Sequence, residues 1–177
     1  TVGLAGGSMV RIKDGEIIDV GPRSAHIAGL PYSAFCRDDL KVLELYFFEP
    51  RPGDPKDYAA LKTSSGKQIG ITVTCAANAL GLLKESDYAF GSRESSRTAI
   101  EPLANYMKKT VDQVARDILE KASEKIIKVV RELVRDYRLE GRNIVLVGGG
   151  GGAGALVPYI ASKLKLDSEV VENHAVI

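Results

Sequence analysis

The sequence predicts an α/β protein with a β-rich first half and a helical second half. Three observations lead to this prediction. Short apolar runs alternate with turn residues in the first 75 residues, an apolar stripe at helical spacing follows residue 110, and a glycine run comes directly after a strand-like segment. We expect residues 1–91 to form the β-rich part and residues 92–177 the helical part, which ends in a strand–glycine loop–helix–strand unit.

In the first half, five apolar-rich segments have the length of strands. They lie at residues 9–13, 16–20, 40–49, 58–63 and 68–74. The first two flank Asp14-Gly15, a pair that tolerates the positive φ of a tight turn, so they predict a hairpin. The last two predict a second hairpin that turns at residues 64–67. Residues 21–31 contain two Pro and two Gly, and we expect them to be irregular.

In the second half, four segments predict helices and two predict strands. The helices are expected at residues 75–83, 99–107, 111–137 and 153–164, and the strands at residues 143–147 and 169–172. Residues 92–96 are polar and predict a linker. Pro102 must lie in a first turn or kink its helix, because proline has no backbone N–H.

The helix expected over residues 111–137 has the clearest signals. Thr110 and Gln113 can form a capping box at its start, and apolar residues then recur at steps of three and four. Charged residues four apart, such as Arg116 and Glu120, predict ion pairs on the exposed side. Gly141 can end the helix.

Composition excludes several classes of protein. The 177 residues are 45% hydrophobic, and 24 Lys and Arg against 23 Asp and Glu give a formal net charge of +1. Such a chain can bury a core, and its charge balance gives no reason to bind nucleic acid. No apolar run approaches the roughly 20 residues that cross a bilayer. We therefore expect neither nucleic acid nor a membrane as partner.

The cysteines and histidines predict no metal site. Cys36 and Cys75 lie in no CxxC pattern, which fits reduced thiols in a cytoplasmic protein, and no secretory signal is visible. His26 lies in an irregular segment and is expected to be solvated. His174 lies near the end of the sequence, and the histidines and cysteines lack the spacing of zinc ligands.

The glycine run predicts a nucleotide or phosphate site. It consists of Gly148, Gly149, Gly150, Gly151 and Gly152. Without Cβ atoms this backbone can turn sharply and approach a ligand closely, and the following helix presents N–H groups and a positive dipole end to an anion. The structural alternative is that the glycines only let the helix pack tightly on the strand.

A dinucleotide-binding module is a second hypothesis. Gly149, Gly151 and Gly154 satisfy GxGxxG between a strand and a helix, and Glu172 follows about twenty residues on, where an acid can hold a ribose. However, a run of glycines meets this motif almost by default, and a Rossmann domain should begin with its fingerprint unit. A third hypothesis is a non-catalytic domain that binds partner subunits.

Several segments resemble the hydantoinase/oxoprolinase family, in the order that the family has them. Residues 144–158 (IVLVGGGGGAGALVP) resemble its late glycine loop. Residues 1–8 (TVGLAGGS) and 20–25 (VGPRSA) are similar to its Gly-Gly-Ser and Gly-Pro-x-Ser-Ala segments, and residues 71–74 (ITVT) to its Thr-Val-Thr-Asp-Ala-Asn segment. The resemblance thus touches most of the chain.

The resemblance implies an actin-like ATPase fold, with ribonuclease-H-like halves around an ATP cleft. Members of the family use ATP with Mg²⁺ to open cyclic amides such as hydantoins and 5-oxoproline, and related subunits act in ketone carboxylation. The late glycine loop lies against the adenosine and its nearest phosphates in this superfamily, which assigns that role to residues 148–152. Gly6, Gly7 and Ser8 match a segment near the cleft. The sequence names no catalytic acid or base.

The chain also departs from the family pattern. Cys75 stands where the family has Asp, Asn78 is the nearest asparagine, and residues 28–33 replace a Pro-Gly-Pro-Ala-Cys-Tyr-like stretch. The Asp-x-Gly-Thr phosphate loops are absent. We therefore expect a middle-to-late piece of a larger enzyme, inactive by itself, whose partners are ATP, a small cyclic amide, and the rest of the parent chain or a second hydantoinase-type subunit.

Overall fold

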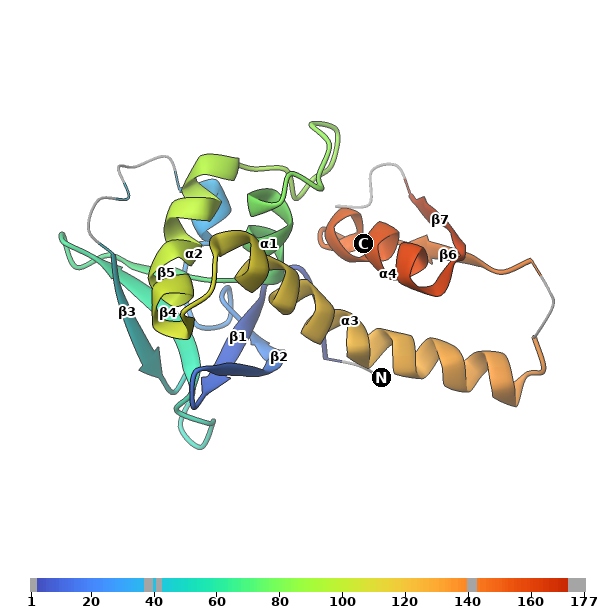
Figure 1. The fold of residues 1–177 in the computed structure, drawn as a ribbon, viewed down its shortest axis with the longest axis horizontal. Coiled ribbons are helices and arrows are strands. Elements are labelled where there is room, and N and C mark those ends of the chain that lie inside the picture. Colours follow the sequence, from blue (N-terminus) through green and yellow to red (C-terminus); the bar gives the residue numbers. More distant parts are fainter. Residues whose placement is uncertain (1–2, 37–39, 41–42, 140–142, 172–177) are drawn as a thin grey trace.

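The computed structural model describes residues 3–36, 40, 43–139 and 143–171, and it confirms the α/β class. The elements, in chain order, are β1 (Ser8–Lys13), β2 (Glu16–Ser24), the short 3-10 helix η1 (Ser33–Phe35), β3 (Leu43–Phe48), β4 (Tyr58–Thr63), β5 (Gln68–Gly70), α1 (Val73–Ala79), α2 (Arg93–Met107), α3 (Val111–Asp136), β6 (Val145–Gly148), α4 (Ala153–Leu164) and β7 (Asp167–Val170). Figure 1 shows β1–β5, α1 and α2 on one side, the β6–α4–β7 unit on the other, and α3 extending between them.

Both predicted hairpins are present in one antiparallel sheet, whose order is β2-β1-β4-β3 with β5 also paired to β4. Asp14 and Gly15 join β1 to β2 with φ values of 52° and 78°, as a tight turn requires. The β2 strand continues to Ser24, which pairs with Ser8, so the irregular segment predicted from residue 21 begins later.

The end of the second hairpin differs from the prediction. β5 stops at Gly70, and α1 spans Val73–Ala79, whereas the sequence predicted a strand to residue 74 and a helix over 75–83. The helix begins early because the Thr72 side chain accepts a hydrogen bond from the Cys75 N–H at 3.3 Å and caps the first turn. All residues of α1 are buried.

The polar linker predicted at residues 92–96 is wrong. Ser92 is the N-cap of α2 and accepts a hydrogen bond from the Ser95 N–H at 3.0 Å, so the helix begins at Arg93. Ser96 is buried, and its hydroxyl donates to the Ser92 carbonyl at 2.8 Å. Pro102 lies well inside the helix rather than in its first turn.

The predicted long helix is confirmed as α3, with the capping box between Thr110 and Gln113 in place. Its first half packs into the core, whereas Leu133 in its second half is 48% exposed. The expected pair of Glu120 with Arg116 is not formed; Glu120 instead forms an ion pair with Lys163 of α4 at 2.6 Å. Gly141 lies outside the described residues.

The strand–glycine loop–helix–strand unit is confirmed, with shifted strands. β6 and β7 are parallel neighbours, and α4 is the crossover between them. The observed strands, Val145–Gly148 and Asp167–Val170, replace the predicted 143–147 and 169–172. Glu172 and His174 lie outside the described residues.

One large core joins the two predicted parts of the chain. It contains Ile71 from the β-rich part together with Ile118 of α3 and Ile160 of α4. The division at residue 91 stays a prediction. Within the described ranges, no helix is both long enough and apolar enough to span a membrane.

Candidate functional site

Three segments from distant parts of the sequence meet around one cavity of about 230 Å³. They are the turn at Gly6 and Gly7, the first turn of α1 at Thr74, and the loop before α4 at Gly151 and Gly152. The remaining lining residues are small or aromatic, namely Ala5, Tyr32, Phe35, Tyr88 and Ala89. The cavity therefore lies where the segments that resemble the hydantoinase/oxoprolinase family come together.

Glycine is required where the first turn meets the glycine loop. A Cβ added at Gly6 would lie 2.6 Å from Thr74 Oγ1 and 3.0 Å from the Cα of Gly152, and a Cβ at Gly152 would overlap the backbone nitrogen of Gly6. The Gly6 carbonyl also accepts a hydrogen bond from the Thr74 N–H at 2.8 Å. The three segments are thus held in direct contact by their backbones.

The Ser8 side chain closes the first turn. The Ser8 N–H donates to the Ala5 carbonyl at 3.0 Å, and the Ala5 N–H donates to Ser8 Oγ at 2.9 Å. Ser8 is buried and does not line the cavity. Its hydroxyl shapes the turn that presents Gly6 and Gly7.

Four of the five glycines in the run have surroundings that differ from one another. Gly148 ends β6 and packs on α4, since a Cβ there would lie 2.5 Å from Val157 Cγ2. Gly150 has a φ of +87° and faces open space. Gly151 faces the Tyr88 ring, 3.1 Å from its Cβ position, and Gly152 is the N-cap of α4. Gly151 and Gly152 line the cavity, and Gly148 supports the packing of the helix on the strand.

A carboxylate from the protein itself lies at the start of α4. Asp87 Oδ1 is 3.0 Å from the position of a Cβ added at Gly154, and Asp87 Oδ2 accepts a hydrogen bond from the Lys84 N–H at 2.7 Å. A negative charge is favoured at this end of a helix. The first turn of α4 therefore already faces an anion.

The cavity walls are uncharged and partly aromatic. None of the described residues that line it carries a charge. Tyr32 stacks on Phe35 with ring centroids 5.8 Å apart and an interplanar angle of 25°. Burial raises the pKa of the Tyr32 phenol above its usual value, so its hydroxyl is a neutral donor and acceptor at pH 7.

Asn78 supports the aromatic wall, a role that sequence analysis did not assign to it. Its amide donates to the carbonyls of Thr74 and Ala89, both at 2.9 Å, and its Oδ1 accepts from the Gly91 N–H at 2.8 Å. These bonds tie α1 to the segment that carries Tyr88. A buried asparagine in a helix of small residues is the signal that could have identified it.

The other candidate residues are not brought to this cavity. His26 is exposed, and its carbonyl accepts from the Gly29 N–H in a turn. Cys36 and Cys75 are buried thiols that are not joined in a disulfide, and Cys75 Sγ lies 3.2 Å from Thr72 Oγ1. In the part of the chain that the structure describes, His, Cys, Asp and Glu form no cluster of three or more that could hold a metal ion.

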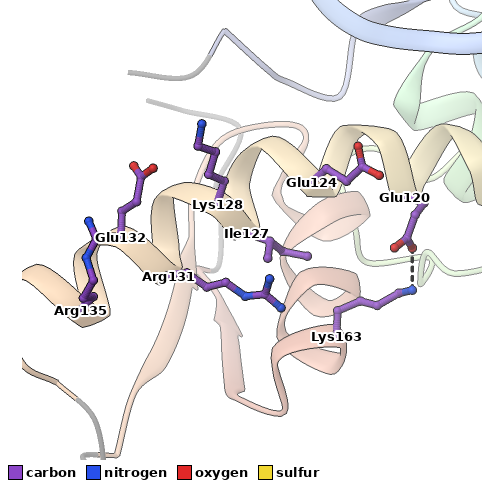
Figure 2. A pocket seen from close by; sticks show the side chains of 8 residues that line it. All are labelled: Glu120, Glu124, Ile127, Lys128, Arg131, Glu132, Arg135 and Lys163. Carbon is purple, nitrogen blue, oxygen red and sulfur yellow. Dashed lines mark ion pairs between the residues drawn. The ribbon is translucent and has the colours of Figure 1, made fainter.

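A larger groove of about 520 Å³ lies between α3 and α4 and has charged walls. Figure 2 shows Glu120 and Lys163 facing one another at one end of it. Tyr159 of α4 donates a second hydrogen bond to Glu120 at 3.0 Å. The Lys163 ammonium holds the pKa of the Glu120 carboxyl below its usual value. This end of the groove therefore fastens α4 to α3.

The fold and the cavity together have the features of a protein that binds a small molecule: a glycine-lined, concave, largely apolar site with a few polar groups. Comparison with known families identifies the family of the chain. The hydantoinase/oxoprolinase family profile matches residues 1–177, the whole chain, and the chain therefore belongs to that family. Among curated proteins, no sequence matches this chain.

Proposed function

We propose that this chain is part of an ATP-dependent enzyme that opens cyclic amides of the hydantoin or 5-oxoproline type. In this proposal the fold is part of an actin-like ATPase, and the loop at residues 148–152 lies on the adenosine side of the nucleotide. Membership of the hydantoinase/oxoprolinase family supports the reaction class. When bound, ATP would phosphorylate the amide oxygen and make the ring carbon electrophilic.

The observation that best supports the proposal is the meeting of three family-like segments at one cavity. Gly6, Thr74 and Gly152 are far apart in the sequence, yet their backbones and side chains are in contact. Glycines allow a ligand to approach the backbone closely. Close packing already requires glycine at Gly6 and Gly152, and a binding role would account for the cavity beside them.

The residues that line the cavity fit the uncharged end of a nucleotide better than they fit its phosphates. The described lining supplies neither a cation for phosphate nor a carboxylate for Mg²⁺. Asp87 at the start of α4 would repel a phosphate placed there. In this proposal, therefore, Mg²⁺ and the outer phosphates bind to the rest of the parent enzyme or to a second subunit.

The dinucleotide hypothesis shares the local geometry. A parallel β6–α4–β7 crossover with Gly149, Gly151 and Gly154 at its turn is compatible with both hypotheses. Two observations favour the ATP hypothesis: the family match, and the antiparallel sheet that precedes this unit. The hypothesis of a purely structural glycine loop explains Gly148 and Gly152, which packing requires, but gives no reason for the cavity beside Gly151.

Calorimetric titration with Mg-ATP, ADP and NAD tests the proposal. We expect ADP and ATP to bind and NAD not to bind. Gly151→Val should abolish this binding, because its side chain would enter the cavity beside Tyr88. Gly66→Asn is the control for a glycine replaced in an open turn away from the cavity, because asparagine tolerates the φ of +85° at that position. Binding of NAD alone, or unchanged ADP binding by Gly151→Val, would contradict the proposal.

A further inference from the structure

Tyr32 is held more firmly than the other aromatic residues that line the cavity. Phe35 is 48% exposed and Tyr88 is 66% exposed, whereas Tyr32 is partly buried. The Tyr32 ring packs against a second core cluster that contains Met9 and Leu30, and it also stacks on Phe35. A side chain with such contacts loses them when it changes rotamer. Tyr32 is therefore a fixed part of the cavity wall.

The backbone of Tyr32 is fixed as well. The Pro31 carbonyl accepts a hydrogen bond from the Gly70 N–H at 2.9 Å, and Tyr32 and Gly70 form a β-bridge. The Tyr32 carbonyl accepts a hydrogen bond from the Phe35 N–H at 3.0 Å. These bonds tie the segment to the end of β5, so the antiparallel sheet sets the position of the ring.

The Tyr32 hydroxyl lies against the glycine turn at the start of the chain. A Cβ added at Gly7 would overlap this hydroxyl and lie 2.7 Å from Cζ of the ring. The Gly7 backbone is itself held in place, because its carbonyl accepts a hydrogen bond from the Ala25 N–H at 2.9 Å. The Tyr32 side chain therefore fills the space beside Gly7, and neither partner has room to move toward the other.

The space that Tyr32 fills limits the size of the cavity. Its volume of about 230 Å³ is below the roughly 300–1,000 Å³ of pockets that hold a whole drug-sized molecule. Phe35 and Tyr88 can turn toward solvent to make room for a ligand, since each is widely exposed. Tyr32 cannot, because its ring is packed and its hydroxyl meets the Gly7 backbone.

We propose that Tyr32 is the specificity-determining residue of this cavity, and that it excludes ligands whose bound part is larger than the present volume. Tyr32 lies in residues 28–33, the stretch that departs from the family pattern, so the size limit is a property of this chain. The inference rests on the proposed function only for the ligand, a nucleotide. A small residue at this position should let the cavity accept larger ligands.

A pair of substitutions tests whether Tyr32 is fixed. Gly7→Ala should lower the midpoint of thermal unfolding by about 2–12 °C, the range expected for one methyl group forced into a packed site of a chain of this size. In a Tyr32→Ala background the same substitution should cost less than about 2 °C, because the atoms it meets are gone.

Gly148→Ala is the control for this pair. Its methyl group would meet Val157 of α4 instead of Tyr32, so its loss should be the same in both backgrounds. Circular dichroism establishes that each variant is folded, and Tyr32→Leu replaces Tyr32→Ala where the latter does not fold. An equal loss from Gly7→Ala in both backgrounds would overturn the inference.

The second test uses p-cresol, which has the shape of the tyrosine side chain and requires no nucleotide. It should bind in the space that Tyr32→Ala leaves empty. At about ten times its Kd, it should raise the unfolding midpoint of Tyr32→Ala by about 3–6 °C and leave that of the unmodified chain unchanged. Tyr137→Ala lacks an exposed ring that does not line the cavity, and it should not respond. An equal response of all three proteins, or none, would contradict the assignment.

The third test measures the size limit itself by calorimetric titration with ADP, N6-benzyl-ADP and 8-benzylamino-ADP. The two analogues carry an added ring at different edges of the base. The unmodified chain should bind both at least about tenfold more weakly than ADP, and Tyr32→Ala should bind one of them at least about tenfold more tightly than the unmodified chain does. Tyr137→Ala should behave as the unmodified chain. If Tyr32→Ala improves the binding of neither analogue, Tyr32 does not set the size limit.

The inference and the proposed function can fail separately. If ADP binds to the unmodified chain and Tyr32→Ala improves neither analogue, the proposed function stands and the role of Tyr32 is wrong. If ADP binds to neither protein while p-cresol stabilises only Tyr32→Ala, Tyr32 still limits the cavity and the nucleotide role of the loop is wrong.

Discussion

The contact between Gly6 and Gly152 predicts that Gly152→Ala destabilises the protein more than its small size suggests. The added methyl group would overlap the Gly6 nitrogen and lie 2.9 Å from the Gly6 Cα. Both are backbone atoms, so no side chain can rotate away to make room. The turn at Gly6 must move, or α4 must move away from it.

The expected loss follows from the cost of overpacking. Inserting a methyl group into a well-packed site costs about 1–3 kcal/mol, and a clash with backbone favours the upper half of that range. For a chain of this size, each kcal/mol lowers the midpoint of thermal unfolding by about 2–4 °C, so about 2–3 kcal/mol corresponds to a fall of about 4–12 °C.

Urea and thermal unfolding measure this loss. The matched control is Gly150→Ala: its φ of +87° strains an alanine, but the added methyl group meets nothing within 4 Å. We expect this control to lose only about 1–2 kcal/mol, the cost of placing an alanine in the left-handed region. If Gly152→Ala is as stable as the parent chain, or no less stable than Gly150→Ala, the backbone contact does not have the structural role described here.

Two other predictions concern the supports of the site. Asn78→Ala should lower the free energy of unfolding by about 2–3 kcal/mol, because it leaves the Ala89 carbonyl and the Gly91 N–H without their hydrogen-bond partner. Urea unfolding measures this loss. A loss below about 0.5 kcal/mol would argue against the stabilising role of the Asn78 hydrogen bonds. The lowered pKa of Glu120 stabilises the fold above the ordinary glutamate pKa of about 4.3, and this stabilisation is lost as the pH falls through the lowered folded value. Glu120→Gln should therefore be less stable than the parent at pH 7, and the difference should disappear in acid; a difference that grows in acid would contradict the ion pair with Lys163.

Sequence prediction succeeded where the signals are local. Thr110 and Gln113 are three residues apart and define the start of α3 by themselves. It failed at Thr72 because residues 68–74 alternate like a strand, and only burial of the whole of α1 makes the helix favourable from Val73. Sequence prediction also missed the ion-pair partner of Glu120, because Lys163 is distant in the sequence and close only in the fold.

The candidate site was predicted in part. The glycine run and the turn at Gly6 were identified from the sequence, but their contact was not, because nothing local in either segment specifies it. The place of Tyr88 in the site could not be predicted from local sequence either. It lies in a segment without regular structure, and its place beside Gly151 depends on the bridge that Asn78 makes. Side chains contributed by tertiary contacts alone have no signature in a single sequence.

The long helix α3 has a mechanical consequence. Its 26 residues make a rod about 39 Å long, with its first half held in the core and its second half extending along α4. The cavity at Gly6 and Gly152 lies at the other junction between the same two parts of the molecule. Because the backbones of Gly6 and Gly152 are in contact there, moving α4 away from the rest of the molecule would have to break that contact as well as the packing along α3.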